Sequence, residues 1–325
     1  MAQAIDRLVT IYGGSGFLGR HLVRALAKRG WRIRVAVRRP ELANFLQPLG
    51  MVGQIHAVQA NVRFPESVAS AAEDADALVN LTGILFQTGR QTFEGVQAEG
   101  ARAVAEAAAK QSAKLVHVSA IGADAKSQSA YARTKAAGEA AVKSAVPQAT
   151  IFRPSILFGP EDGFFNRFAA MARIAPALPL IGGGATRFQP VFVGDVATAI
   201  VTTLEDLALE DKAKPGMTYE LGGPEVKTFR ELMELMLKEI ERRRLLVPIP
   251  FAVARLQAFF LELLPNPLLT RDQVILLERD NVVSAEAERE GRTLKGMDIS
   301  PTALAAVLPS YLGRFRKSGQ FTRAS

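Results

Sequence analysis

Tyr131 and Lys135 lie four residues apart in an alanine-rich stretch that is typical of a helix. At this spacing the phenol and the ammonium share one helix face. A nearby ammonium favours the phenolate, so the tyrosine can donate a proton to a carbonyl or accept one from it. The pair is common in unrelated proteins, and its meaning depends on the elements around it.

A glycine-rich turn stands at the start of the chain, directly after the apolar run 8–12. Its glycines fit two spacings, Gly14-x-Gly16-x-x-Gly19 and Gly13-x-x-Gly16-x-x-Gly19. Both remove side chains where a pyrophosphate must approach the backbone and a helix N-terminus. The turn therefore predicts a dinucleotide site, although a tight strand-to-helix turn without a ligand would have the same glycines.

Two arginines, Arg38 and Arg39, follow the apolar run 33–37. An NAD-selective site presents Asp or Glu at this place to the ribose 2′-hydroxyl. Guanidinium groups can instead bind a 2′-phosphate with two hydrogen bonds. We therefore expect NADPH rather than NADH, against the alternative that the pair is only a solvated basic edge.

Further cofactor contacts are expected in the glycine turn and in the segments that follow later strands. These candidates are Ser15, Phe17, Leu18, Asn61, Val62, Leu81, Thr82, Gly83, Pro154 and Ile156.

The elements that must position these residues alternate between short apolar runs and amphipathic stretches up to residue 152. Strands are predicted over 8–12, 33–37, 55–59, 77–81, 114–118 and 150–152, and helices over 16–29, 65–72, 92–110 and 130–144. This alternation is typical of an α/β fold with a doubly wound parallel Rossmann sheet.

After residue 153 the pattern loosens, with helices expected over 196–204 and 229–242. We expect residues 1–153 to form the nucleotide-binding core. Residues 154–325 should form a smaller α/β lobe over the strand C-termini, intertwined with the core as one structural unit.

The composition excludes several classes of site. The chain has no cysteine and only three histidines among 325 residues, so no metal site is expected. Its net charge of +8 indicates an acidic partner or a phosphorylated ligand. No zinc finger or basic repeat favours nucleic acid. The start of the chain lacks a secretion signal pattern, so we expect a cytoplasmic protein.

Together these features resemble the extended short-chain dehydrogenase/reductase superfamily. The resemblance rests on the glycine turn, on the Tyr131 and Lys135 pair, and on residues 153–155 (RPS), 191–197 (VFVGDVA) and 219–224 (YELGGP). It implies that Tyr131 acts as acid/base, that Lys135 tunes it and contacts the cofactor, and that Ser119 polarises a substrate carbonyl.

The chain departs from the superfamily's pattern at three positions. Ser119 sits one position early, Gln97 replaces a helix-borne asparagine, and Asn61 replaces an acidic residue that faces adenine. Loss of one oxyanion donor costs a factor of order 10² to 10³ in rate, so the departures predict weak catalysis.

Four stretches resemble one branch of the superfamily, the accessory subunit nine of the respiratory complex I alpha subcomplex and its bacterial relatives. They are 117–123 (HVSAIGA), 131–139 (YARTKAAGE), 158–168 (FGPEDGFFNRF) and 308–312 (LPSYL). The resemblance implies a structural NADPH and a place on the peripheral arm near the quinone site. It also implies a peripheral location at the cytoplasmic side of a bacterial inner membrane.

The stretch 251–264 is apolar around most of a helix and is too short and too charged to span a bilayer. We expect it to pack in the core of the lobe; the alternative is a surface that docks on a membrane or a partner. Arg242, Arg243 and Arg244, with Arg314, Arg316, Lys317 and Arg323, are candidates for contact with anionic lipid, or are solvated charges.

Three functions remain open. The first is an accessory subunit of complex I with a structural cofactor. The second is a free-standing NADP-dependent oxidoreductase or epimerase that uses Tyr131 and Lys135, and the third is an NADPH sensor or chaperone in quinone metabolism.

Overall fold

The computed structural model describes residues 7–209, 216–265 and 267–317 of the chain. At its centre is a sheet of seven strands in the order β11-β6-β5-β4-β1-β2-β3, and every neighbouring pair is parallel. The strands are β1 (Leu8–Tyr12), β2 (Arg32–Val37), β3 (Ile55–Gln59), β4 (Ala77–Asn80), β5 (Lys114–Val118), β6 (Thr150–Pro154) and β11 (Thr218–Leu221). The predicted doubly wound Rossmann sheet is confirmed, with each of the first six strands within two residues of its expected bounds.

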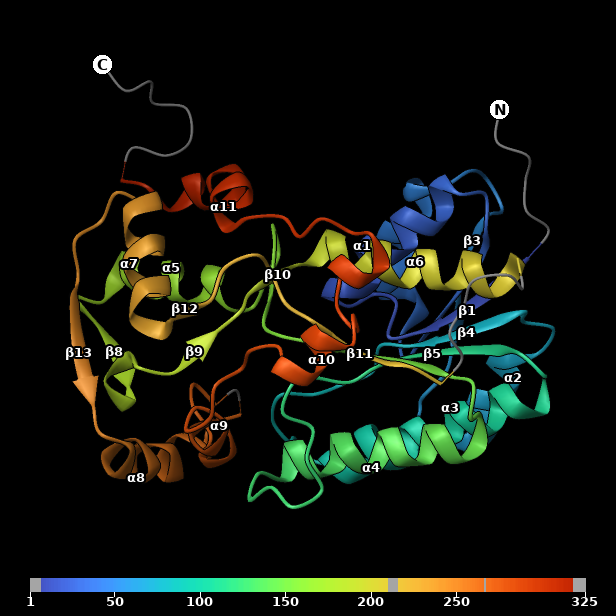
Figure 1. The fold of residues 1–325 in the computed structure, drawn as a ribbon, viewed down its shortest axis with the longest axis horizontal. Helices are drawn as coiled ribbons and strands as arrows, with labels where there is room; N and C mark the ends of the chain where they lie inside the picture. The colour runs from blue at the N-terminus through green and yellow to red at the C-terminus, as the bar shows by residue number, and fades with distance from the viewer. Residues whose placement is uncertain (1–6, 210–215, 266, 318–325) are drawn as a thin grey trace.

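Helices cover both faces of this sheet (Figure 1). One face carries α1 (Phe17–Lys28) and α6 (Val193–Leu209), and the other carries α2 (Pro65–Ala72), α3 (Glu99–Lys110) and α4 (Ala130–Ala145). Because both faces are covered, the strands are continuous apolar runs rather than alternating ones.

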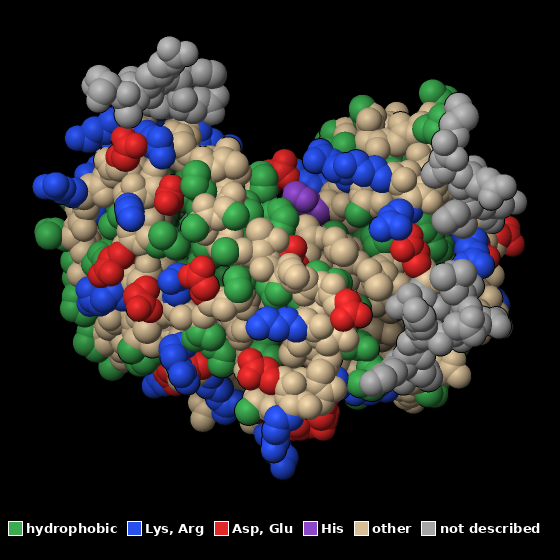
Figure 2. All heavy atoms as spheres, turned by 45° about the horizontal axis from the view of Figure 1, so that its top comes forward, with side chains coloured by type: hydrophobic (Ala, Val, Ile, Leu, Met, Phe, Trp, Pro, Cys, Tyr) green, Lys and Arg blue, Asp and Glu red, His purple; other side chains and the backbone are tan. Residues whose placement is uncertain are grey.

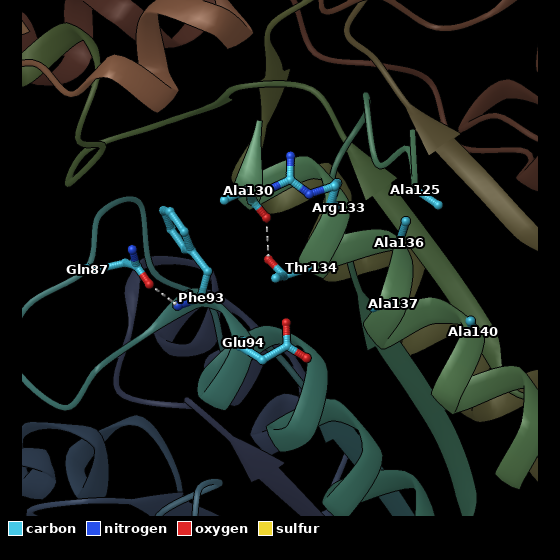
Figure 3. A pocket seen from close by; sticks show the side chains of 10 residues that line it. All are labelled: Gln87, Phe93, Glu94, Ala125, Ala130, Arg133, Thr134, Ala136, Ala137 and Ala140. Carbon is cyan, nitrogen blue, oxygen red and sulfur yellow. Dashed lines mark hydrogen bonds between the residues drawn. The ribbon is translucent and has the colours of Figure 1, made fainter. Parts of the chain in front are cut away.

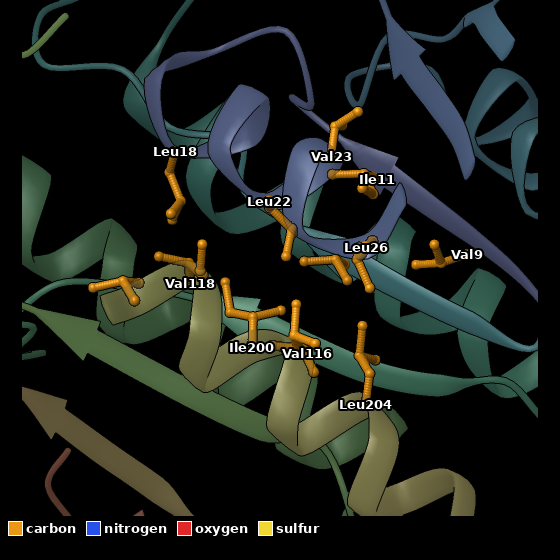
Figure 4. Packing of buried hydrophobic residues seen from close by; sticks show 14 of the residues in the cluster. Val9, Ile11, Leu18, Leu22, Val23, Leu26, Val116, Val118, Ile200 and Leu204 are labelled. Atoms are coloured by element: carbon orange, nitrogen blue, oxygen red, sulfur yellow. The ribbon is translucent and has the colours of Figure 1, made fainter. Parts of the chain in front are cut away.

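The core between α1, α6 and the sheet is closely packed (Figure 4). Leu22 and Leu26 of α1 pack near Ile200 and Leu204 of α6 in the same cluster as the sheet residues, and all four are 0–1% exposed. This packing fixes α1, and with it the glycine turn, at the carboxyl end of β1.

The second helical layer brings α4 close to the start of α3. A π-helical turn, η2 (Glu94–Ala98), precedes α3. A Cβ on Gly138 would lie 2.3 Å from the carbonyl oxygen of Gln97, so only glycine allows this approach. The helix with Tyr131 and Lys135 is thereby packed closely against η2.

The rest of the described chain forms a smaller part beside the carboxyl ends of the strands (Figure 1). Its core joins Phe158, Phe165, Phe188 and Phe229 to aliphatic residues of the last helix. Its elements are β7 (Leu157–Phe158), α5 (Phe165–Ile174), β8 (Ala177–Ile181), β9 (Arg187–Phe188), β10 (Val191–Phe192), β12 (Lys227–Thr228), α7 (Phe229–Glu239), β13 (Leu245–Ile249), α8 (Phe251–Leu261), α9 (Arg271–Leu276), α10 (Ala285–Arg289) and α11 (Leu304–Leu312). Four short 3₁₀ segments complete the described elements: η1 (Pro40–Leu49), η3 (Gly182–Gly184), η4 (Lys295–Met297) and η5 (Gly313–Phe315).

The later half of the chain returns to the Rossmann sheet with α6 and β11. The two helices predicted there are found as α6 and α7. The division at residue 153 stays a prediction, as does the expectation that both parts form one unit.

Helix α8 corrects one expectation. It buries only Ala254 and Ala258 as core residues, whereas Leu256, Phe259 and Phe260 are 62%, 49% and 60% exposed. The prediction that the stretch packs in the core is therefore wrong, because an all-round apolar pattern does not show which face is covered. Among the described residues, no helix is both long and apolar enough to cross a bilayer.

Candidate functional site

The glycine turn joins β1 to α1 with its backbone open to the surroundings. Gly13 has a φ of +80°, which favours glycine, and its carbonyl accepts a hydrogen bond from the Gly16 N–H at 3.0 Å. Gly16 is the N-cap residue of α1, so the free N–H groups of Phe17 and Leu18 stand at the helix N-terminus. Ser15 lies between these glycines. This is the arrangement that receives a pyrophosphate.

The glycines are also required for packing. A Cβ on Gly19 would lie 2.4 Å from the Gly14 carbonyl oxygen, and one on Gly13 would lie 3.3 Å from the carbonyl carbon of Leu81. The turn thus presses against both α1 and the segment after β4. A dinucleotide can reach the backbone here only because these side chains are missing.

Arg38 and Arg39 follow β2, and both side chains are exposed. Within the described parts of the chain, neither guanidinium has a hydrogen bond or an ion pair. They are free to bind a phosphate beside the carboxyl end of β2, where the sequence predicts the 2′-phosphate.

The segment after β3, which contains Asn61 and Val62, is held by contacts within the protein. The side-chain oxygen of Asn61 accepts a hydrogen bond from the Arg63 N–H at 3.2 Å, and its own N–H donates to Ser67. Val62 is buried, and one of its methyl groups lies 2.8 Å from the position of a Cβ on Gly100. Both residues therefore shape the loop between β3 and α2.

Leu81, Thr82 and Gly83 follow β4, and Gly83 lies close to the candidate catalytic lysine. Thr82 donates a 2.6 Å hydrogen bond to the Asn80 side-chain oxygen. A Cβ on Gly83 would be 3.3 Å from the Lys135 ammonium nitrogen. The structure thus brings the β4 loop and α4 together.

Tyr131 and Lys135 both belong to α4 but have opposite pKa shifts. Burial and the carboxylate of Asp272 raise the pKa of Tyr131 to about 12. Burial lowers the pKa of Lys135 to about 8, while Glu139 acts in the other direction. The Lys135 ammonium donates to the Val118 carbonyl at 3.2 Å. Phe93 packs edge-on against the Tyr131 ring, with the centroids 5.9 Å apart.

Ser119 and His117 lie beneath α4 with polar atoms that have no partner in the described structure. Ser119 is 4% exposed, and its hydroxyl makes no hydrogen bond. His117 is 1% exposed with both ring nitrogens unpaired, and burial and Lys135 lower its pKa to about 3. The imidazole is therefore neutral at physiological pH.

Both polar groups of the Gln97 side chain are hydrogen-bonded within the protein. Its amide nitrogen donates to the Ile84 carbonyl at 2.8 Å, and its side-chain oxygen accepts from the Thr134 hydroxyl at 3.1 Å. The residue joins η2 to α4 and the β4 loop, which is a structural use of the position.

Pro154 ends β6 and is buried, and Ile156 follows it. Asn281 ties this segment down: its side-chain oxygen accepts from the Ser155 hydroxyl at 2.7 Å and from the Ile156 N–H at 3.2 Å. Its amide nitrogen donates to the Ile121 carbonyl at 3.3 Å. Sequence reasoning missed Asn281, because nothing local to residue 281 shows that it joins two strand ends.

Asp272 of α9 is a second residue that the sequence did not reveal. Its carboxylate accepts hydrogen bonds from the N–H groups of Ala130 at 2.6 Å and Tyr131 at 3.3 Å, and from the Ser129 hydroxyl at 2.8 Å. A carboxylate at this end also complements the helix dipole. The smaller part of the chain thus fixes the N-terminus of the Tyr131 helix.

Two of the quoted stretches meet in space. The Tyr311 hydroxyl of α11 donates a 2.5 Å hydrogen bond to Asp162, whose carboxylate also caps the start of α5. The neighbouring Glu161 forms a 2.8 Å ion pair with Arg20 of α1. The segment 158–168 is therefore held from both sides, by the last helix and by the helix of the glycine turn.

Two neighbouring cavities share Gln87, Phe93 and Ala130 in their linings. One, of about 460 Å³, lies along the small side chains of α4, toward which the Glu94 carboxylate points (Figure 3). The other, of about 490 Å³, lies between Phe93, Ala130 and α9. A separate hollow appears between the two parts of the molecule, with Lys or Arg side chains beside it (Figure 2).

Most of the basic residues singled out for lipid contact already have partners. Arg242 and Arg244 donate to the carbonyl oxygens of Phe315 and Ala172, and Arg316 donates to that of Glu239. Arg314 binds the Asn166 side chain, and Arg323 lies outside the described residues. Arg243 and Lys317 are exposed, and within the described residues their side chains have no hydrogen-bonding partner.

Proteins similar in sequence over most of the chain include a respiratory subunit. The chain is 36% identical over 324 residues to the mitochondrial NADH dehydrogenase [ubiquinone] 1 alpha subcomplex subunit 9 of Arabidopsis thaliana, which covers 96% of this chain and 79% of that protein. It is 35% identical over 224 residues to a ceramide reductase of Caulobacter vibrioides, covering 67% of this chain and 69% of that protein.

The fold is also found in solved enzymes. The UDP-glucuronic acid 4-epimerase of Bacillus cereus, in complex with UDP-glucuronic acid and NAD, superimposes with a TM-score of 0.72 at 17% identity over 95% of this chain and 98% of its own. Residues 9–222 match the family model described as NAD dependent epimerase/dehydratase. This range contains the glycine turn and the Tyr131 helix, so its cofactor class is a nicotinamide dinucleotide. The chain therefore belongs to the NAD dependent epimerase/dehydratase family, as its sequence motifs predict.

Proposed function

We propose that this protein is an NADPH-binding accessory subunit of respiratory complex I, with a cofactor that stabilises the structure and turns over little or not at all. The observation that carries the proposal is the 36% identity to the plant subunit over 96% of the chain. A resemblance of this extent includes the smaller part as well as the Rossmann sheet.

The residues of the site fit the cofactor. The glycine turn and the N-terminus of α1 would hold the pyrophosphate, together with Ser15, Phe17 and Leu18. Arg38 and Arg39 would bind the 2′-phosphate, because both guanidinium groups are exposed and unpaired in the described chain. Lys135 would donate to the nicotinamide ribose. Asn61, Val62, Leu81, Thr82, Gly83, Pro154 and Ile156 would form the walls at the strand ends.

The chemistry of the site favours retention of the cofactor over turnover. A tyrosine whose pKa is about 12 is a poor base near neutral pH. The hydroxyl of Ser119 is buried beneath α4, and both side-chain groups of Gln97 are engaged in hydrogen bonds. Gln97 therefore offers a substrate carbonyl no free donor, and burial shields the hydroxyl of Ser119.

The proposed place is the peripheral arm near the quinone site, at the cytoplasmic side of a bacterial inner membrane. The exposed apolar residues of α8 support contact with a neighbouring subunit or with the membrane surface. If the protein purifies from native membranes apart from complex I, and if its deletion leaves assembly of the complex unchanged, this assignment is wrong.

The cofactor assignment can be tested on protein purified without added nucleotide. Extraction should yield about one NADP(H) per chain, with exchange slow enough to survive purification. Loss of both guanidiniums in Arg38→Gln/Arg39→Gln should weaken NADPH binding about 10- to 100-fold, since hydrogen bonds to charged groups contribute about 1.5–3 kcal/mol. NADH binding should change little. Arg24→Gln, on an exposed position of α1, is the control. Equal loss for both nucleotides would contradict phosphate recognition.

A second candidate is a free-standing oxidoreductase, favoured by the intact Tyr131 and Lys135 pair and by the resemblance to a ceramide reductase. It predicts oxidation of NADPH by an amphipathic carbonyl compound and its loss in Tyr131→Phe. A screen of such compounds and quinones without any cofactor oxidation would exclude it.

A further inference from the structure

The cavity of about 490 Å³ between the loop 84–93, the N-terminus of α4 and α9 is not used by the dinucleotide site described above. Its volume is in the range of roughly 300–1,000 Å³ that is typical of small-molecule sites. Half of its ten lining residues are apolar, namely Phe86, Phe93, Ala130, Pro267 and Ile275. Phe93 of this lining also packs edge-on against the Tyr131 ring.

The polar side chains of its wall are largely engaged with the protein itself. The Asp272 carboxylate caps α4, and the Glu262 carboxylate accepts hydrogen bonds from the backbone and side chain of Arg271. Thr270 and Gln273 form a reciprocal cap at the start of α9. The Gln87 side-chain oxygen accepts from the Phe93 N–H. Such a wall offers little to sugar hydroxyls, whereas its apolar surface gains from covering a hydrocarbon chain.

The rim carries one cation with free donors. Arg271 is 58% exposed at its side chain and uses its Nε on Glu262. Within the described residues, its two terminal nitrogens have no partner. Its guanidinium lies 5.5 Å from the centre of the Phe259 ring, so the rim continues into the exposed apolar face of α8.

We propose that this cavity binds the hydrocarbon chain of a single-chain anionic amphiphile, with the anionic group held at the rim by Arg271. We infer this chemistry because apolar lining residues, the unpaired terminal nitrogens of Arg271 and an apolar approach over α8 occur together, while Glu262 and Asp272 are engaged by Arg271 and by the N-terminus of α4. It does not depend on which dinucleotide occupies the glycine turn.

The test is calorimetric titration of the full chain with straight-chain carboxylates of six to sixteen carbons, each below its micellar concentration. Affinity should rise about threefold to fourfold for each added methylene until the cavity is filled, and should then level off. Decanoate should bind more tightly than decanol, and this preference should disappear in Arg271→Gln.

Ile275→Glu places a carboxylate inside the cavity and should weaken decanoate binding at least tenfold. Leu256→Glu makes the same change on the exposed face of α8 and should leave the affinity within twofold. If the two variants lose binding equally, or if chain length has no effect, the amphiphile only adsorbs to the apolar face and the proposal is wrong. Ile275→Phe fills space in the cavity without adding a charge, so the affinity should level off at a shorter carboxylate chain. This variant provides the test if Ile275→Glu does not fold.

Discussion

His117 should make the native state sensitive to acid. Its imidazole is buried, and its pKa falls from 6.5 to about 3 because of burial and the neighbouring Lys135. Below pH 6.5 the imidazole of His117 binds a proton in the unfolded chain, whereas in the native chain it stays neutral. The contribution of His117 to the free energy of unfolding is therefore complete above its pKa in the unfolded chain. It is lost as the pH falls toward its lower pKa in the native chain.

The magnitude follows from the width of that window. Each pH unit across it costs about 1.4 kcal/mol for one proton, so from pH 6.5 to 4.5 the loss from His117 alone is about 3 kcal/mol. His117→Leu removes this loss. It also removes two ring nitrogens without partners in the described structure, and a buried unsatisfied group costs about 1–3 kcal/mol. We therefore expect the variant to be at least as stable as the wild type at pH 7.5.

The measurement is urea unfolding followed by circular dichroism at pH 7.5 and 4.5. Carboxylates titrate in all the proteins compared and cancel in the difference between variant and wild type. His56→Leu, at an exposed position of β3, is the matched control. If the advantage of His117→Leu is the same at both pH values, the imidazole is not held neutral by burial. If the variant is several kcal/mol less stable at pH 7.5, the ring nitrogens have partners such as ordered water.

Three further predictions concern the site. Because the pKa of Lys135 is lowered to about 8, the affinity for NADPH measured by calorimetry should fall between pH 7 and 9 as the ammonium is lost, and Lys135→Met should show no such fall. Asp272→Ala should lower the free energy of unfolding by about 1–2 kcal/mol through loss of the α4 cap, whereas Asp272→Asn, which keeps one of the two acceptor oxygens, should retain part of it; equal losses would contradict a capping role. Gly19→Ala should cost about 1–3 kcal/mol and release the cofactor, since its Cβ would overlap the backbone, while Gly163→Ala, in open space, should be tolerated in the same denaturation and extraction assays.

The core of the fold could be predicted because its signals are local. Each central strand is a short apolar run between polar turns, and the glycine turn marks where the first strand ends and α1 begins. The expected helix over 92–110 covers η2 and α3 together, since a π-turn does not interrupt an apolar pattern.

The smaller part could be predicted less well, because its contacts join distant residues. Strands such as β9 and β12 are two residues long, and their paired residues lie 39 and 41 positions apart in sequence. Their residues show no alternation that a pattern could detect. Asp272 reaches α4 from 141 residues away, and an aspartate at the start of any helix would look the same.

The unpredicted contacts connect motifs far from the glycine turn to the elements of the candidate site. Arg153, at the end of β6, forms two hydrogen bonds of 2.8 and 2.6 Å with Glu139 of α4, and its other terminal nitrogen lies 3.7 Å from Glu220 of β11. The stretch with Asp162 is fixed by α11 in the same way.

A buried pair of this kind is costly to break, since one charge would then remain without a partner. Arg153 therefore links the Tyr131 helix to strands at the edge of the sheet, so that α4 cannot move without disturbing β11. A catalytic tyrosine needs only the local geometry of its helix. A cofactor that stabilises the whole structure also needs both parts of the chain fixed relative to each other, which Asp272 does at α4 and Glu161 does at α1.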